Sequence, residues 1–303
     1  MTPEDDRLHT GPEAGFHDAV TFAFGDPGAK LYGIARLSHG AGATTALAVL
    51  YAGDKPVASG AGRGGAPEDA REWDGVTAAG VRVSVVAPLE AWTVAWDGDG
   101  GGFDLRFEAC SAPAALDAEG PVVRVGAMEG YEQLCRVTGS VSHGGRTYQV
   151  RCLGQRGQLW GSPDWSRLEL TRMVSAWLGD DRALTLMSVR PAKAKSHLDE
   201  AVSGFLFEAG EAVEIADPRL STTYDRERRQ RRAGLELWMT DDGDYARRVA
   251  GEALCTTALD IGDKRFQSAF FLWRMEGREG IGRYDVVRRA PNGGGGGSRK
   301  RSR

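Results

Sequence analysis

The stretch Phe103-Asp104-Leu105-Arg106-Phe107-Glu108-Ala109 alternates apolar and charged side chains without a break. An extended strand points successive side chains to opposite faces, so this stretch would place its large apolar residues on one face and its three charges on the other. Trp92-Thr93-Val94-Ala95-Trp96 alternates in the same way, and only the Gly- and Asp-rich residues 97–102 separate the two stretches. The pair therefore predicts a β-hairpin.

Similar pairs of alternating stretches recur along the chain, each joined by a short turn rich in Gly and charged residues. They are 134–142 with 146–153, 167–178 with 183–189, 201–208 with 212–215, and 265–275 with 282–288, and a single strand is expected at 235–239. Helical periodicity is confined to short segments, at 67–73 and 193–202. Many short strands joined by tight turns indicate an all-β chain built from antiparallel barrels or sandwiches.

The length of 303 residues suggests two domains. Residues 112–128 break the strand rhythm with Pro, Ala and Gly, so we expect a first domain at 16–111 and a second at 129–290, packed permanently together. Residues 291–303 form a Gly-rich basic tail whose composition is typical of a flexible, disordered end.

Composition narrows the class of protein. No run of 18 apolar residues exists, which argues against a transmembrane segment, and the acidic N-terminus lacks the order of charges of a signal peptide. The four cysteines are scattered, as expected of thiols in a reducing compartment, so we predict a cytoplasmic protein. The net charge is −4, and without the four basic residues of the tail it is −8, which argues against nucleic-acid binding. Nothing in the sequence sets the oligomeric state.

A family resemblance rests on Gly130-Tyr131-Glu132-Gln133 and on the segment from Gly154 to Trp165, Gly-Gln-Arg-Gly-Gln-Leu-Trp-Gly-Ser-Pro-Asp-Trp. In these motifs the chain resembles two-domain lipocalin-like proteins such as carotenoid 1,2-hydratase (hydroxyneurosporene synthase) and, more distantly, lipocalin-like cyclases and Diels–Alderases of natural-product pathways. The resemblance extends over about residues 16–287. It implies two lipocalin-like antiparallel β-barrel domains packed side by side, with few short helices.

The usual motif of that family reads Gly-x-Arg-Asp-His-x-Trp-Gly. Gly154, Arg156, Trp160 and Gly161 match it, whereas Gly157 and Gln158 stand where the family has Asp and His. The resemblance implies a place for Trp160 in a reactive cavity. It also implies that the histidine chemistry of the hydratases is absent here or carried by another residue.

Each candidate site residue has a functional and a structural interpretation. Trp160 and Trp165 can line a cavity for an apolar ligand or belong to the core. Arg156 can bind substrate or form a structural ion pair with Glu132 or Asp164. Gln158 can orient a carbonyl or a water molecule but cannot act as an acid or base.

Polar residues elsewhere have weaker patterns. Tyr224 and Asp225 are candidates for a polar rim around a barrel mouth, and Arg283 is interpreted as a structural arginine that closes a barrel. His197, Asp199 and Glu200 do not have the spacing of a known metal-ligand set, so no metal is expected.

Two functions compete. The first is a cofactor-independent hydratase, isomerase or cyclase that acts on a hydrophobic isoprenoid or polyketide-like substrate in a barrel cavity. Its proton donor would be a buried acid with a raised pKa, Asp164 ahead of Glu132. The alternative is a non-catalytic carrier of a hydrophobic small molecule such as a lipid or terpenoid, and a filled scaffold is a third possibility. An acid at the inner end of a pocket would favour the enzyme, and a purely apolar lining would favour the carrier.

Overall fold

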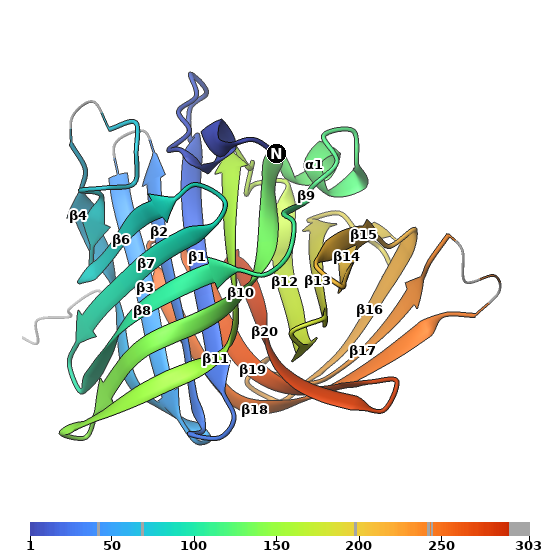
Figure 1. The fold of residues 1–303 in the computed structure, drawn as a ribbon. Coiled ribbons are helices and arrows are strands. Elements are labelled where there is room, and N and C mark those ends of the chain that lie inside the picture. The colour runs from blue at the N-terminus through green and yellow to red at the C-terminus, as the bar shows by residue number, and fades with distance from the viewer. Residues whose placement is uncertain (41–42, 68–69, 197–198, 241–242, 244, 291–303) are drawn as a thin grey trace, which may run out of the picture.

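A computed structural model describes residues 1–40, 43–67, 70–196, 199–240, 243 and 245–290. The chain is almost entirely β, and its strands form two separate antiparallel sheets that lie side by side (Figure 1). The all-β prediction with two barrel-like domains is therefore confirmed.

The first sheet has eleven strands in the order β11-β1-β2-β3-β4-β5-β6-β7-β8-β10-β9. Pairing of β10 with β11, from Met128↔Gly161 to His143↔Arg146, closes this sheet into a barrel. The bounds are β1 (His17–Asp26), β2 (Leu31–Gly40), β3 (Ala43–Ala52), β4 (Lys55–Gly65), β5 (Thr77–Ala78), β6 (Val81–Ala87), β7 (Ala91–Gly98), β8 (Gly101–Ala109), β9 (Ala114–Ala115), β10 (Met128–His143) and β11 (Arg146–Gly161).

The second sheet has nine strands in the order β15-β14-β13-β12-β20-β19-β18-β17-β16 and curls into a half-barrel (Figure 1). Its bounds are β12 (Leu168–Gly179), β13 (Arg182–Pro191), β14 (Ala201–Glu208), β15 (Glu211–Glu214), β16 (Asp217–Tyr224), β17 (Gln230–Trp238), β18 (Arg247–Ile261), β19 (Lys264–Met275) and β20 (Arg278–Arg289).

The hairpins predicted from alternation are confirmed, from β7–β8 to β19–β20. The predicted helices are wrong for the described residues of 67–73 and 193–202, which contain no α-helix, while residues 68–69, 197 and 198 lie outside the described chain. The α-helix α1 (Pro121–Gly126) instead falls in the segment expected to be a linker, and a short 3-10 helix, η1 (Pro3–Asp6), lies at the N-terminus. Proline suits the first turn of a helix, so the residues that interrupt the strand pattern also begin α1.

The chain passes from the first sheet to the second between Gly161 and Leu168, which lies after the segment 112–128 where the composition changes. β10 and β11 belong to the first barrel because β10 pairs with β8 and β11 pairs with β1. Alternation shows that two strands form a hairpin, but it does not show which sheet the hairpin joins. The predicted limits of the two domains as folding units stay a prediction.

Of the four buried apolar clusters in the described residues, the three largest lie inside the first barrel, on one face of the second sheet and between the sheets. The interior of the first barrel is filled by side chains that include Phe22, Trp92 and Phe107. A second cluster covers the concave face of the second sheet, and a third lies between the sheets, where Tyr32 stacks on Phe270 with ring centroids 5.5 Å apart. The space between the two sheets is thus partly sealed by hydrophobic packing.

The described residues contain no helix long and apolar enough to cross a membrane. Cys135 and Cys255 are buried, and all four cysteines are free thiols. The basic tail lies outside the described residues, and the cytoplasmic location stays a prediction.

Candidate active site between the two sheets

Alternation along β11 separates the motif residues into two groups. Arg156, Gln158 and Trp160 point toward the inside of the first barrel, in step with Phe22, Val20 and Asp18 of β1. Residues 155, 157 and 159 point the other way, toward the second sheet. The residues that carry the family motif therefore do not share one site.

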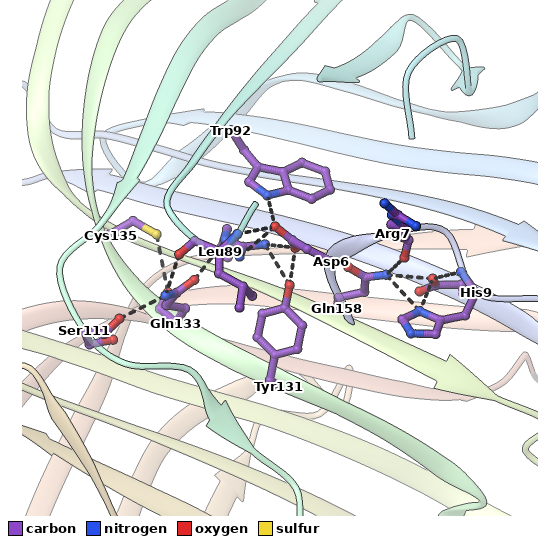
Figure 2. Close-up of polar contacts among 12 residues, drawn as sticks. Asp6, Arg7, His9, Leu89, Trp92, Ser111, Tyr131, Gln133, Cys135 and Gln158 are labelled. Atoms are coloured by element: carbon purple, nitrogen blue, oxygen red, sulfur yellow. Dashed lines mark hydrogen bonds and ion pairs between the residues drawn. The ribbon is translucent and has the colours of Figure 1, made fainter. Parts of the chain in front are cut away.

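Inside the barrel, Arg156 pairs with the buried carboxylate of Asp6, with Nη1 2.8 Å from Oδ1. Figure 2 shows Asp6 between Trp92 and Tyr131, which also donate hydrogen bonds to it. The sequence led us to expect Glu132 or Asp164 as the ion-pair partner of Arg156, and this expectation is wrong: the partner is Asp6. Local sequence patterns do not reveal this partner, because Asp6 and Arg156 are 150 residues apart and meet only when the N-terminal segment packs against β11.

Gln158 and Trp160 also contact the N-terminal segment. Gln158 donates to the backbone carbonyl of Arg7 at 2.7 Å and to Asp18 at 2.7 Å, and Figure 2 shows it beside Arg7 and His9. The Trp160 ring stacks on His9, with centroids 3.9 Å apart. In this structure, three residues predicted to bind ligand hold the chain's own N-terminus.

On the opposite face of the same strands, Glu132 lies buried between the sheets. Its carboxylate accepts hydrogen bonds from Gln155 Nε2 at 2.6 Å and from Arg283 Nη2 at 2.9 Å. Gly157 makes this position possible, because a Cβ there would lie 2.4 Å from the Glu132 Cδ atom. The glycine at the family's Asp position therefore leaves room for Glu132. Burial raises the pKa of Glu132, against the opposing effect of Arg283.

Arg283 links Glu132 to a second buried acid, Asp285. Arg283 and Asp285 lie on β20 and face the first barrel, while Tyr284 between them faces the core of the second sheet. Arg283 Nη1 is 3.2 Å from Asp285 Oδ2. Burial raises the pKa of Asp285 from 3.8 to about 6, against the opposing charge of Arg283. Asp285 can therefore hold or release a proton near neutral pH.

Asp285 and Arg283 line a cleft of about 480 Å³ between the sheets, a size typical of small-molecule sites. The wall of the cleft is largely apolar, and its mouth is bordered by exposed residues such as Arg63 and Asp260. Trp165, predicted as ligand-binding, lines this cleft beneath the ammonium group of Lys264, 5.1 Å from the ring centroid. The apolar lining consists mainly of Leu47, Met128, Leu159, Trp165, Met173, Met187, Phe266 and Val287.

Two further basic groups face the cleft. Arg36 on β2 donates from Nη1 to Thr21 Oγ1 at 2.9 Å, and burial lowers its pKa to about 10, so it remains charged at neutral pH. Burial also lowers the pKa of His17, which favours its neutral form.

The remaining predicted residues lie outside the cleft. Asp164 is exposed, and hydrogen bonds from the Ser166 hydroxyl and backbone hold the pKa of its carboxyl below the usual value. The desolvation that its predicted role as an acid requires is therefore not found there. Tyr224 ends β16, and Asp225 caps the following turn through Arg229, on the far strands of the second sheet. Neither residue lines the cleft.

Sequence reasoning missed Arg36 and Asp285, and it assigned Arg283 a purely structural role. Arg283 and Asp285 do carry a signal, because they alternate with Tyr284 and Val286 in a strand that is buried on both faces. Charged residues repeated on one face of such a strand indicate a polar site between layers. Within the described chain no group of three or more His, Cys, Asp or Glu residues could hold a metal ion, and His197 lies outside it.

Comparison with solved structures shows a shared fold at low sequence identity. An AttH-like protein of Nitrosomonas europaea is 14% identical with a TM-score of 0.67, covering 89% of this chain and 91% of that one. Kievitone hydratase of Nectria haematococca is 10% identical with a TM-score of 0.65, covering 94% and 91%. CghA, solved with Sch210972, is 11% identical with a TM-score of 0.64, covering 91% and 89%.

The fold agrees with the lipocalin-like resemblance in general, while the finer resemblance to carotenoid 1,2-hydratase stays a prediction. A search of curated protein sequences gave no match. The sequence profile of a domain of unknown function, DUF7064, matches residues 2–289, and the chain therefore belongs to the DUF7064 family.

Proposed function

We propose that the protein is an acid–base enzyme that hydrates, isomerises or cyclises a hydrophobic small molecule at a double bond, in the cleft between its two sheets. The observation that carries the proposal is Asp285, a buried acid at the inner end of an apolar cleft with its pKa raised to about 6. The catalytic residue is then Asp285, in place of the Asp164 expected from the sequence.

The inner end of the cleft favours an enzyme over a carrier. A carrier needs only an apolar surface, and buried ionisable groups cost stability without improving its affinity for an apolar ligand. This cleft instead contains Asp285, Arg283 and Arg36, with Glu132 bonded to Arg283 behind them. Perturbed acids in a cleft are typical of sites where protons are transferred.

The geometry suits proton transfer to carbon. Protonated Asp285 gives its proton to one carbon of the double bond, and Arg283 stabilises the carboxylate that forms. The carbocation that results loses a proton from a neighbouring carbon, or adds water and loses one of the water protons, or is attacked by a second double bond of the same molecule to form a ring cation that then loses a proton. In each case the Asp285 carboxylate takes up the released proton, which restores the acid. Glu132 positions Arg283 from the other side, and the apolar walls keep bulk water from the intermediate. The name of one structural neighbour, kievitone hydratase, supports hydration as one of these outcomes.

The test uses solvent isotope. The protein is incubated in D2O with a hydrophobic extract of its host, and mass spectrometry searches for compounds that gain carbon-bound deuterium only when protein is present. We expect Asp285→Asn to lower the rate of deuterium gain at least about a hundredfold, because a general acid typically contributes a factor of this size or more to the rate. Asp164→Asn, an exposed acid of the same type, is the matched control and should behave as wild type.

The opposite result is also informative. A compound that co-purifies with the protein in native mass spectrometry, yet gains no deuterium and does not change in structure, would identify a carrier and would contradict the proposal. Equal deuterium gain with Asp285→Asn would remove Asp285 from the mechanism.

A further inference from the structure

Arg36, which is half-buried in the wall of the cleft, differs from the buried arginines in lacking a carboxylate partner. Arg156 pairs with Asp6, Arg172 with Glu200 and Arg283 with Glu132, each at 3.4 Å or less. In the described part of the chain, no carboxylate lies within 4.0 Å of the Arg36 guanidinium, and its hydrogen bond is to the neutral hydroxyl of Thr21. A guanidinium that is partly removed from water and has no anion beside it loses some of its hydration free energy, which a bound anion would recover.

The position of Arg36 directs it into the cleft. Its Cα lies opposite Thr21 of β1 and Leu47 of β3, and all three residues line the cleft on the side of the first barrel. Its planar group presents several donors, and a carboxylate or another delocalised oxyanion can accept two of them at once. A neutral apolar ligand would leave these donors unused.

The other charged groups of the cleft do not neutralise Arg36 by contact. Asp285 is engaged by Arg283, while Asp260 pairs with Arg265 and Lys264 pairs with Asp263 near the mouth. Arg63 is exposed at the mouth, and Glu132 is bonded to Arg283 and Gln155. Across the lining, basic side chains outnumber acidic ones: Arg36, Arg63, Lys264 and Arg283 against Asp260 and Asp285.

From this arrangement we infer that the ligand of the cleft is an amphipathic anion: an apolar body carrying a carboxylate or a similarly delocalised oxyanion, which binds Arg36. The inference rests on the proposed function and specifies its substrate class. The apolar body would lie along the methionine-rich wall formed by Met128, Met173 and Met187, whose flexible side chains adapt to irregular ligands. The anion would lie in the part of the cleft that also contains Asp285, so the reacting bond would be near the charged end.

Competition binding tests the substrate class. A neutral apolar fluorophore, N-phenyl-1-naphthylamine, reports occupancy of the cleft in the full-length protein at neutral pH. Dodecanoate and dodecan-1-ol, which share their chain length, then displace it. We expect wild type to bind dodecanoate at least about tenfold more tightly than the alcohol, as a charge-assisted pair of hydrogen bonds would give.

Variants assign the preference to Arg36. Arg36→Met keeps an apolar stem without the charge. It should reduce the ratio of the affinities for dodecanoate and dodecan-1-ol to about one, while the affinity for dodecan-1-ol stays unchanged. Arg36→Lys should keep part of the preference, because it restores the charge without the planar group. Arg82→Met, the same change at an exposed residue that does not line the cleft, should behave as wild type.

The outcomes separate the two proposals. A wild-type protein that binds the fluorophore and both lipids with equal affinity would overturn the anionic substrate class alone, and this result does not depend on any variant folding. A preference that survives in folded Arg36→Met would also overturn it. A protein that binds none of the three would remove the cleft as a ligand site and would overturn the proposed function as well.

Discussion

Two residues on one strand set the electrostatics of the cleft. Arg283 and Asp285 are separated by one residue, so the pleat of β20 turns both toward the first barrel and into a layer with little water. Burial there outweighs the attraction of Arg283, because the pKa of Asp285 is raised rather than lowered. The site therefore holds a charge that the fold alone would not favour, which is typical of functional residues.

This imbalance predicts a pH-dependent stability. The pKa of Asp285 is about 6 in the folded protein against 3.8 for the free side chain, so the folded state binds more protons between these values. The free energy of unfolding should fall as pH rises through this window, by up to about 3 kcal/mol from Asp285. Asp285→Asn removes the charge, so the variant should lose less stability than wild type between pH 4 and pH 7. Urea unfolding at both pH values measures the difference.

Two other buried carboxyl groups, Asp18 and Glu132, also have pKa values raised by burial, so their titration adds to the pH dependence of stability. The comparison with Asp285→Asn cancels their contribution to first order. Asp164→Asn serves as the control because its carboxyl is exposed and its pKa is lowered instead. Parallel stability profiles of wild type and Asp285→Asn would show that Asp285 is ionised over the whole range and is no proton donor.

At the scale of elements, β11 serves two sides of the molecule at once. Its inward residues bind the N-terminal segment, which lies across one end of the first barrel (Figure 1). Its outward residues contact Glu132: Gln155 donates a hydrogen bond to the carboxylate, and Gly157 leaves room for it. A single strand thus couples the closure of the barrel to the geometry of the cleft.

The contact between η1 and β11 predicts a large effect of one N-terminal residue. Asp6→Ala would leave the guanidinium of Arg156 buried without its partner and would remove the acceptor for Trp92 and Tyr131. We expect a loss of about 3 kcal/mol in the free energy of unfolding. Glu4→Ala in the same 3-10 helix changes an exposed acid and should cost less than about 0.5 kcal/mol. Equal effects of the two substitutions would show that the Asp6 contact contributes no stability.

The glycine on the outward face predicts a change in function. In Gly157→Ala the new Cβ would force the Glu132 carboxylate away from Arg283, at a cost of about 1–2 kcal/mol in stability. Since Glu132 helps to raise the pKa of Asp285, its displacement should lower that pKa and reduce turnover. Binding of N-phenyl-1-naphthylamine should persist.

Gly65→Ala on β4 is the matched control, because nothing lies within 4 Å of a Cβ at that position. Turnover of Gly157→Ala equal to that of this control would show that Glu132 does not position the acid.

These elements show how far the sequence predicts the structure. Alternation predicts the hairpins because it reflects the local pleat of each strand. It does not predict that β11 pairs with β1, or that Asp6 meets Arg156, because both contacts join residues at least 128 positions apart. The site shares this limit: Glu132 and Trp165 follow from the motif, whereas Arg36 and Asp285 reach the cleft only through the packing of one sheet on the other.

At the scale of the whole molecule, the cleft exists only while the two sheets stay together. One wall comes from β1 to β4, β10 and β11, and the other from β12, β13 and β18 to β20. Below it the sheets are joined by aromatic contacts across the interface, in which Phe270 of β19 packs against Tyr32 and Tyr51 of the first barrel. Packing of this kind favours a permanent interface over a hinge.

The chain can be divided between the two sheets without interrupting either of them. A cut between Asp164 and Trp165 leaves each sheet whole, with β10 and β11 in the first fragment. Co-expressed as 1–164 and 165–303, the fragments should co-purify as an equimolar complex that retains fluorophore binding, because burial of the apolar interface drives their association. A cut between Gly120 and Pro121 should give little complex, since the pairings of β10 with β8 and of β11 with β1 would then have to form between two chains. Size-exclusion chromatography with native mass spectrometry distinguishes the cases. Fragment 165–303 alone should aggregate through its uncovered face, whereas a soluble monomer would show that the two sheets fold independently and that the cleft can open.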